Sequence, residues 1–125
     1  MPYEHILLQD AGYFLVVGRA PVGLAETLES MNDTISAVAS TPRLPILVDI
    51  RAADFEPTEE EARNLGALLA DPRLSGSRRL AFVAVPGVQF GLARMVSQLS
   101  GREGGAVAVF TDREAALAWL APPSH

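Results

Sequence analysis

Two arginines stand where they could hold an anion. Arg19 and Arg51 each directly follow a run of apolar residues that has the character of a strand. Ligands of open α/β sheets bind in the crevice beyond the carboxyl ends of the strands, so both guanidinium groups would lie at that edge. Together they could grip a carboxylate or a phosphate with bidentate hydrogen bonds. In the alternative interpretation, each arginine pairs with an acidic neighbour: Asp49, Asp54 or Asp112.

Two aromatic residues belong to the same hypothesis. Phe55 follows Arg51 closely, and Phe90 opens the helix expected after a later strand. In the first interpretation they line a small-ligand pocket with the two arginines. In the second, Phe90 is part of the hydrophobic core.

The segment 54–61 concentrates acidic side chains, with five acids in eight residues. Thr58 followed by Glu61 is a capping box, and acids in the first turn of a helix complement its dipole. A purely structural role therefore explains the cluster. Alternatively, these residues form a recognition surface for a basic protein partner, and the binding residues would then be Asp54, Glu56, Thr58, Glu59 and Glu60.

The residue types that many catalytic and metal sites need are scarce. The chain has no cysteine, and its two histidines are His5 and His125. The lack of cysteine excludes disulfides, thiolate metal sites and a cysteine nucleophile, and two distant histidines give no metal-ligand spacing. We therefore expect no catalytic residue, no metal and no cofactor.

Charge and hydropathy limit the partners. Fifteen acids against ten bases give a formal net charge of −5, whereas nucleic acid and anionic lipid surfaces call for a basic footprint. The longest apolar run, 80–86, is far shorter than the roughly 18–20 residues that cross a bilayer. The N-terminus lacks the basic and apolar regions of a signal peptide. The expectation is a cytoplasmic protein without a membrane span.

The elements that must position these residues alternate along the chain. Apolar runs bounded by turn residues predict strands at 4–9, 13–18, 45–50, 80–85 and 106–110. Apolar residues at helical spacing predict helices at 24–40, 59–70, 89–99 and 113–121. The first of these helices should bury Leu24, Leu28, Met31, Ile35 and Val38. The third should bury Leu92, Met95, Val96 and Leu99.

This order of elements predicts an α/β fold. Strands that alternate with helices favour a mostly parallel sheet with right-handed crossovers. We expect five strands, of which the first two form an N-terminal antiparallel hairpin. Residues 1–121 should make one domain and residues 122–125 a disordered tail. A homodimer through the hairpin edge or the first helix is a further hypothesis.

Three stretches of the chain resemble a known superfamily. In segment 46–58 a strand containing Asp49 leads through a short loop to Thr58 at a helix start. This pattern resembles the core of STAS domains, the SpoIIAA-like (anti-sigma factor antagonist-like) superfamily. Segments 79–99 and 109–120 resemble a stand-alone, uncharacterised bacterial branch of it. The resemblance implies a right-handed superhelix of β-α turns.

The resemblance also implies a function. It implies regulatory protein binding that is switched by phosphorylation, with Thr58 as the phosphosite by position. Here the usual Asp-Ser-[Ser/Thr]-Gly becomes Pro-Thr-Glu-Glu at 57–60, so a phosphate would face like charges. Permanent acids could instead mimic the charged state. The related CRAL-TRIO lipid carriers share the architecture and imply an apolar pocket beneath the loops.

The sequence leads to three hypotheses of function. The first is a non-enzymatic regulatory domain that binds an unknown protein partner through the acidic segment. The second is a carrier of a small apolar or anionic ligand in the pocket of Arg19, Arg51, Phe55 and Phe90. An unidentified enzyme is the third.

Overall fold

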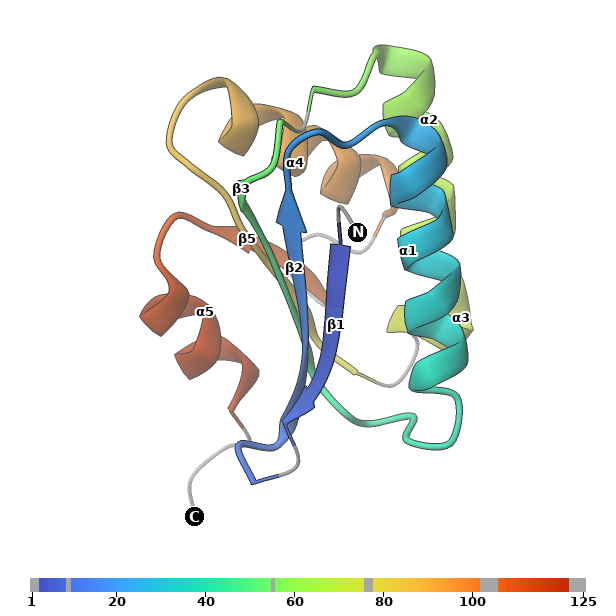
Figure 1. Ribbon diagram of the computed structural model, residues 1–125, viewed down its shortest axis with the longest axis vertical. Helices are drawn as coiled ribbons and strands as arrows, with labels where there is room; N and C mark the ends of the chain where they lie inside the picture. The colour runs from blue at the N-terminus through green and yellow to red at the C-terminus, as the bar shows by residue number, and fades with distance from the viewer. Residues whose placement is uncertain (1–2, 9, 55, 76–77, 102–105, 122–125) are drawn as a thin grey trace.

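Five strands form one sheet in the order β1-β2-β3-β4-β5 in the computed structural model (Figure 1). The structure describes residues 3–8, 10–54, 56–75, 78–101 and 106–121. The strands are β1 (Tyr3–Leu8), β2 (Tyr13–Arg19), β3 (Ile46–Ala52), β4 (Leu80–Val83) and β5 (Val107–Phe110). The proposed tail, 122–125, lies outside the described residues.

The sheet combines one antiparallel pair with three parallel pairs. β1 and β2 form the hairpin, and β2, β3, β4 and β5 are parallel to one another. Gly12 in the hairpin turn has a φ of +80°, which a residue without a Cβ adopts at little cost. The predicted α/β class and the mostly parallel five-stranded sheet with an N-terminal hairpin are therefore confirmed.

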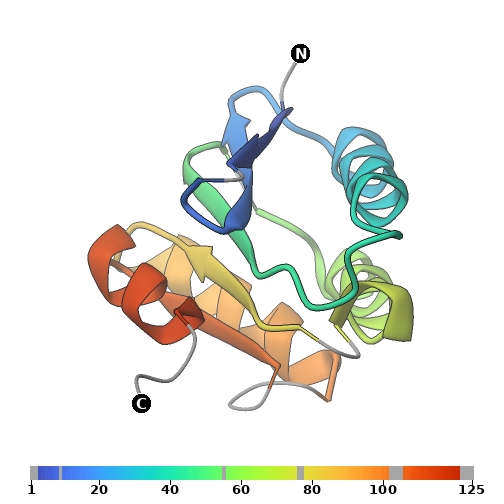
Figure 2. The same cartoon turned by 90° about the horizontal axis from the view of Figure 1, so that it is seen from below.

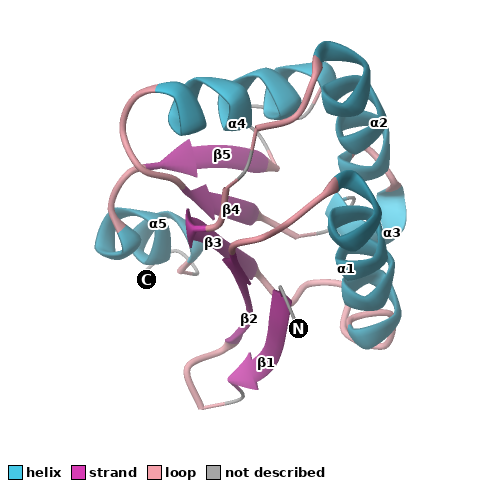
Figure 3. Ribbon diagram, turned by 45° about the horizontal axis from the view of Figure 1, so that its top comes forward, coloured by secondary structure: helices cyan, strands magenta, loops and turns pink. Residues whose placement is uncertain are grey.

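The helices are divided unequally between the two faces of the sheet (Figures 2 and 3). One face carries α1 (Leu24–Ala37), α2 (Glu59–Leu69), α3 (Pro72–Ser75) and α4 (Val88–Leu99). The other carries α5 (Arg113–Leu120). The short α3 was not predicted, because four residues show no helical periodicity. Pro72 suits the first turn of a helix, and the Asp71 carboxylate accepts a hydrogen bond from the Arg73 backbone nitrogen at 2.9 Å.

Each face of the sheet has its own hydrophobic core. The larger core packs strand residues such as Phe14, Ile46 and Leu80 against α1, α2, α3 and α4. The smaller core packs Leu47 and other strand residues against α5. Trp119 of α5 lies at the edge of that smaller core. Its ring centroid is 5.7 Å from that of Phe110 and 5.0 Å from the Arg79 guanidinium carbon.

Helices α2 and α4 approach each other closely at Gly66. A Cβ atom at this position would lie 2.8 Å from the Leu99 Cβ atom and 3.0 Å from the Leu99 carbonyl carbon. The predicted inward face of α4 is therefore partly wrong. Leu99 is 44% exposed, whereas Ala93 and Ser97 are buried. Because the two helices approach closely, small residues occupy buried positions of α4, and Leu99, which the apolar periodicity predicted to be buried, is exposed.

Candidate functional site

The predicted capping box at the start of α2 is confirmed. The Thr58 hydroxyl oxygen accepts from the Glu61 backbone nitrogen at 3.2 Å, and the Glu61 carboxylate accepts from the Thr58 backbone nitrogen at 2.9 Å. Thr58 thus has a structural role as the helix cap. A phosphate on its hydroxyl would replace that capping bond and would face the carboxylates of the first turn.

The acidic segment borders a groove between the N-terminal ends of α1 and α2. The Asp54 carboxylate accepts a hydrogen bond from the Val22 backbone nitrogen at 2.7 Å, which ties the loop after β3 to the loop before α1. The groove has a volume of about 200 Å³. We call it the acidic groove, and the residues that line it are Val22, Gly23, Leu24, Thr27, Asp54, Glu56, Pro57, Glu61 and Leu65.

Three carboxylates therefore meet in the acidic groove, and none of the described lining residues is basic. Asp54 and Glu56 are exposed, and Glu61 is half-buried. The other two predicted binding acids lie outside its lining. Glu60 is exposed on the first turn of α2. Glu59 forms an ion pair with Arg63 one turn later, at 2.5 Å.

The register of β2 and β3 places Arg19 opposite Ala52, next to Arg51, but each of the two arginines is paired with an acid. Arg19 is ion-paired with Glu4. Arg51 donates from its Nε and Nη2 atoms to the two Asp49 carboxylate oxygens, at 3.0 and 2.8 Å. Neither arginine lines the acidic groove or the cavity described below. The placement favours the alternative interpretation, in which each arginine neutralises a neighbouring acid.

The Asp49–Arg51 pair is held in its charged form. Burial raises the pKa of Asp49, but the hydrogen bonds from Arg51 and the positive charges of Arg51 and Arg113 outweigh burial and leave this pKa below its ordinary value. Asp49 is 8% exposed. Such an arrangement orients the end of β3 and leaves the Arg51 guanidinium already engaged.

The crevice at the carboxyl ends of β3 and β4 is filled by a side chain that the sequence analysis did not single out. Gln89 of α4 is buried; its amide nitrogen donates to the carbonyls of Ile50 and Ala53, at 2.8 and 3.0 Å. Its amide oxygen accepts from the Val85 backbone nitrogen at 2.7 Å. The adjacent Phe90 packs partly buried against the larger core, and Phe55 lies outside the described residues. A pocket at this crevice is therefore not supported.

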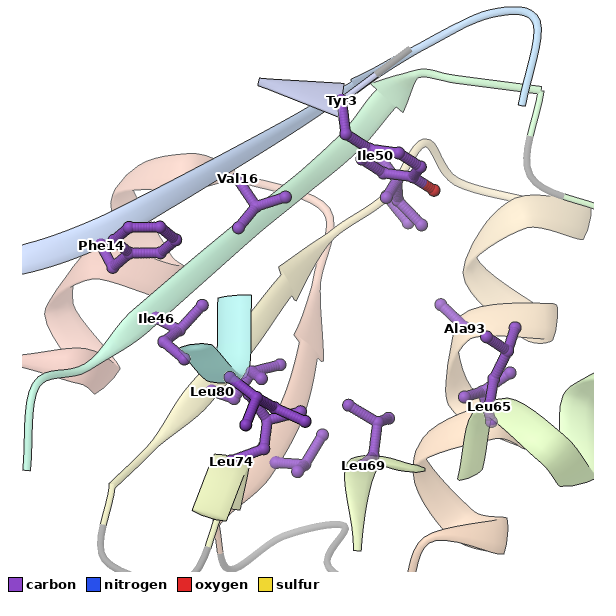
Figure 4. Close-up of a cluster of buried hydrophobic side chains, with 14 of the residues drawn as sticks. Tyr3, Phe14, Val16, Ile46, Ile50, Leu65, Leu69, Leu74, Leu80 and Ala93 are labelled. Carbon is purple, nitrogen blue, oxygen red and sulfur yellow. The ribbon is translucent and has the colours of Figure 1, made fainter. Parts of the chain in front are cut away.

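A second cavity, of about 50 Å³, lies between α1 and the sheet. Its apolar walls come from the strands and from α2, α3 and α4. Figure 4 shows several of these side chains, including Tyr3, Ile46, Leu65 and Leu80. Helix α1 contributes mostly hydroxyl side chains. Its lining residues are Thr27, Ser30, Met31 and Thr34. We call this space the α1 cavity.

Hydrogen bonds fix the hydroxyl groups of the α1 cavity. The hydroxyls of Thr27 and Thr34 donate to carbonyls of their own helix or its cap, Gly23 at 2.9 Å and Ser30 at 2.8 Å. The Tyr3 hydroxyl lies 3.0 Å from the Thr27 hydroxyl oxygen, and it must donate because the Thr27 proton is already engaged. The Ser30 hydroxyl lies 2.8 Å from the His5 Nε2 atom.

The predicted inward face of α1 needs correction. Ile35 and Val38 are buried as expected, but Leu24, Leu28 and Met31 are only partly buried. The fully buried positions include three hydroxyl residues instead, which are Thr27, Ser30 and Thr34. Their spacing of three and four residues was visible in the sequence. A helical period sought among apolar residues alone does not reveal it.

The comparisons with known proteins define the fold class. The chain matches no family model, and no curated protein matches it. The comparison with solved structures shows that the chain has a SpoIIAA-like fold, as the resemblance implied.

One matching solved structure is that of an uncharacterised protein of the DUF3478 family from Shewanella loihica PV-4, which has a SpoIIAA-like fold. The two chains are 20% identical, with a TM-score of 0.61. The match covers 95% of this chain and 92% of the other. At this identity the match establishes the shared fold.

The described residues show neither a membrane-spanning helix nor a metal-binding cluster. None of their helices has the length and apolar character to cross a bilayer. They also contain no group of three or more His, Cys, Asp or Glu side chains arranged to hold a metal ion.

Proposed function

We propose that this chain is a non-enzymatic binding domain of the cytoplasm, and that its acidic groove takes a basic segment of a protein partner. The supporting observation is the convergence of Asp54, Glu56 and Glu61 on one groove between two helix ends. A lysine or arginine side chain that entered this groove would meet carboxylates on several sides. Glu60, exposed nearby on α2, would extend the attraction beyond the groove.

The capping box of α2 supports this proposal, because it fixes the position of Glu61, as the bond from the Val22 nitrogen fixes Asp54. Charged rims steer a partner and select it by sign more than they add affinity. The complex is therefore expected to weaken as salt is added, since exposed charges are screened over about 10 Å at 0.1 M ionic strength. The lack of cysteine removes a thiolate nucleophile, which supports a non-catalytic role.

The test is a quantitative pull-down from a lysate of the native host at several salt concentrations. The variant Glu56→Gln/Glu60→Gln removes two charges without touching the capping box. The matched control is Glu29→Gln, which removes an exposed charge on α1. Partners should be recovered by the wild type and the control and lost from the double variant. Equal recovery by all three proteins would show that the acidic groove is not the binding surface.

A second candidate function, the carriage of a small ligand, is favoured by the α1 cavity. The cavity is apolar on the sheet side and lies beside the acidic groove. Its position differs from that of the predicted pocket, because Arg19, Arg51 and Phe90 do not line it. The ligand chemistry must therefore be inferred from the α1 cavity itself.

A further inference from the structure

The α1 cavity and the acidic groove adjoin each other. Thr27 of α1 and Leu65 of α2 belong to the linings of both. The Tyr3 ring lies at the same junction, and it is accommodated there because Gly18 on the neighbouring strand has no side chain: a Cβ atom at Gly18 would come within 2.8 Å of the Tyr3 ring. A molecule longer than either space could therefore occupy both.

Three hydroxyl groups of the α1 cavity, those of Tyr3, Thr27 and Thr34, offer acceptors rather than donors. The protons of Thr27 and Thr34 are used by helix carbonyls, and the Tyr3 proton is used by Thr27. What each hydroxyl can still present is an oxygen lone pair. These side chains are at least nine-tenths buried. At the junction, where Thr27 borders both spaces, a ligand group that donates hydrogen bonds is therefore accommodated better than one that only accepts.

The charges near this junction are negative, and they favour a hydrogen-bond donor that is positively charged. Burial raises the pKa of the Tyr3 phenol, and the negative charges of Asp54 and Glu26 raise it further. The phenol therefore stays protonated and neutral at physiological pH. A cation is favoured where these carboxylates act together, and an anion is repelled.

We propose that the α1 cavity and the acidic groove together bind a short amphiphilic amine, with its alkyl chain beneath α1 and its ammonium group among Asp54, Glu56 and Glu61. This proposal rests on the second candidate function and names its ligand. An ammonium group has three donors, and each carboxylate has several lone-pair sites. Asp54 and Glu61 can thus keep their present bonds to Val22 and Thr58 and still accept from the ligand.

The volume of the α1 cavity limits the chain length. One water molecule needs about 10–15 Å³ of cavity volume. The α1 cavity, with about 50 Å³, therefore accommodates only a few groups of that size. A short alkyl chain fits within this limit. A long acyl chain would require α1 to move away from the sheet.

The test compares probes that share a chain and differ in the head group. The probes are n-hexylamine, 1-hexanol and hexanoate at neutral pH, with methylamine as the head group alone. Binding is followed by two-dimensional NMR of the labelled protein. Hexylammonium should shift resonances of residues that line both spaces, Thr27 and Leu65 among them, and should bind at least tenfold more tightly than hexanoate or methylammonium.

Two variants separate the two parts of the site. Glu56→Gln should weaken hexylammonium severalfold and leave 1-hexanol unchanged, whereas Glu29→Gln should change neither. Thr34→Leu should fill the α1 cavity and weaken both probes. If Thr34→Leu does not fold, the comparison of the three hexyl probes on the wild-type protein still tests the proposal.

Each outcome bears on a different claim. Equal affinity for all three hexyl probes would overturn the preference for an amine and leave ligand carriage standing. The absence of shifts at the cavity lining with every probe would overturn both. Neither result affects the protein-partner proposal, which the pull-down tests separately.

Discussion

Helices α1 and α2 cover the same face of the sheet but are held in different ways. The start of α2 is closed by the Thr58–Glu61 capping box, and its middle meets α4 at Gly66 with no room for a side chain. The start of α1 has Gly23 as its cap, with no side-chain capping bond. Beneath α1 lie buried hydroxyls and a cavity.

This difference separates a supporting element from a binding element. Close packing and capping fix α2 and the acids at its first turn. Helix α1 is held by hydroxyl contacts to β1 and, beyond its far end, by the buried Arg78, which donates to the carbonyls of Val38 and Leu44 at 3.2 and 3.1 Å. The molecule thus has a fixed wall and a less tightly packed wall around one space. Four substitutions test this contrast.

The largest effect is expected at the contact between α2 and α4. Gly66→Val should lower the free energy of unfolding by about 3 kcal/mol, because the added atoms meet the backbone of α4 and overpacking of a close contact is costly. Ala67→Val is the control, since Ala67 is exposed on the same helix. Urea denaturation measures both. A loss at Gly66 no larger than at Ala67 would show that α2 is not closely packed.

A smaller effect is expected where α1 meets β1. Thr27→Val removes the acceptor of the buried Tyr3 hydroxyl and should lower the free energy of unfolding by about 1–2 kcal/mol. The double variant Tyr3→Phe/Thr27→Val removes both polar partners and should recover part of that loss. If the double variant is as unstable as the sum of the two single variants, the hydroxyl contact contributes nothing.

The capping box should contribute about as much as helix caps usually do. Thr58→Ala should lower the free energy of unfolding by about 1 kcal/mol. Thr58→Ser, which keeps the hydroxyl, is the control and should retain most of the stability. Thermal unfolding of the three proteins distinguishes these values. An alanine variant as stable as the wild type would remove one of the two supports assigned to α2.

The smallest effect is expected on the inward face of α1. Thr34→Val keeps the shape of the side chain and removes a hydroxyl bonded to a carbonyl of its own helix. The change in the free energy of unfolding should stay within about 0.5 kcal/mol, since that carbonyl can still accept the backbone bond of the helix. A loss above about 1 kcal/mol would mean that the Thr34 hydroxyl stabilises α1, whereas we assign it only to the lining of the α1 cavity.

The sequence predicted the sheet because its strands carry strong local signals. The apolar run that became β3 and the Asp-Ala-Gly turn before β2 are both determined by nearby residues. The capping box was predicted for the same reason, because Thr58 and Glu61 are three residues apart. These features depend on chemistry within one element or one turn.

The candidate site depended on contacts between distant residues. Gln89 reaches the carbonyls of Ile50 in β3 and of Ala53 just after it, 39 and 36 residues away along the chain, and no local pattern predicts such bonds. The polar face of α1 was missed for another reason. Buried hydroxyls that bond to their own helix look like solvent-facing residues when hydrophobicity alone is considered.

The α1 cavity also bears on how the protein responds to hydrostatic pressure. Unfilled internal volume disappears on unfolding, so the unfolded chain and its solvent occupy less space and compression favours that state. In this molecule the α1 cavity is one such volume, and it lies under a single helix next to the surface proposed for binding. Compression should therefore loosen α1 from the sheet before it disturbs the packing of α5 on the opposite face.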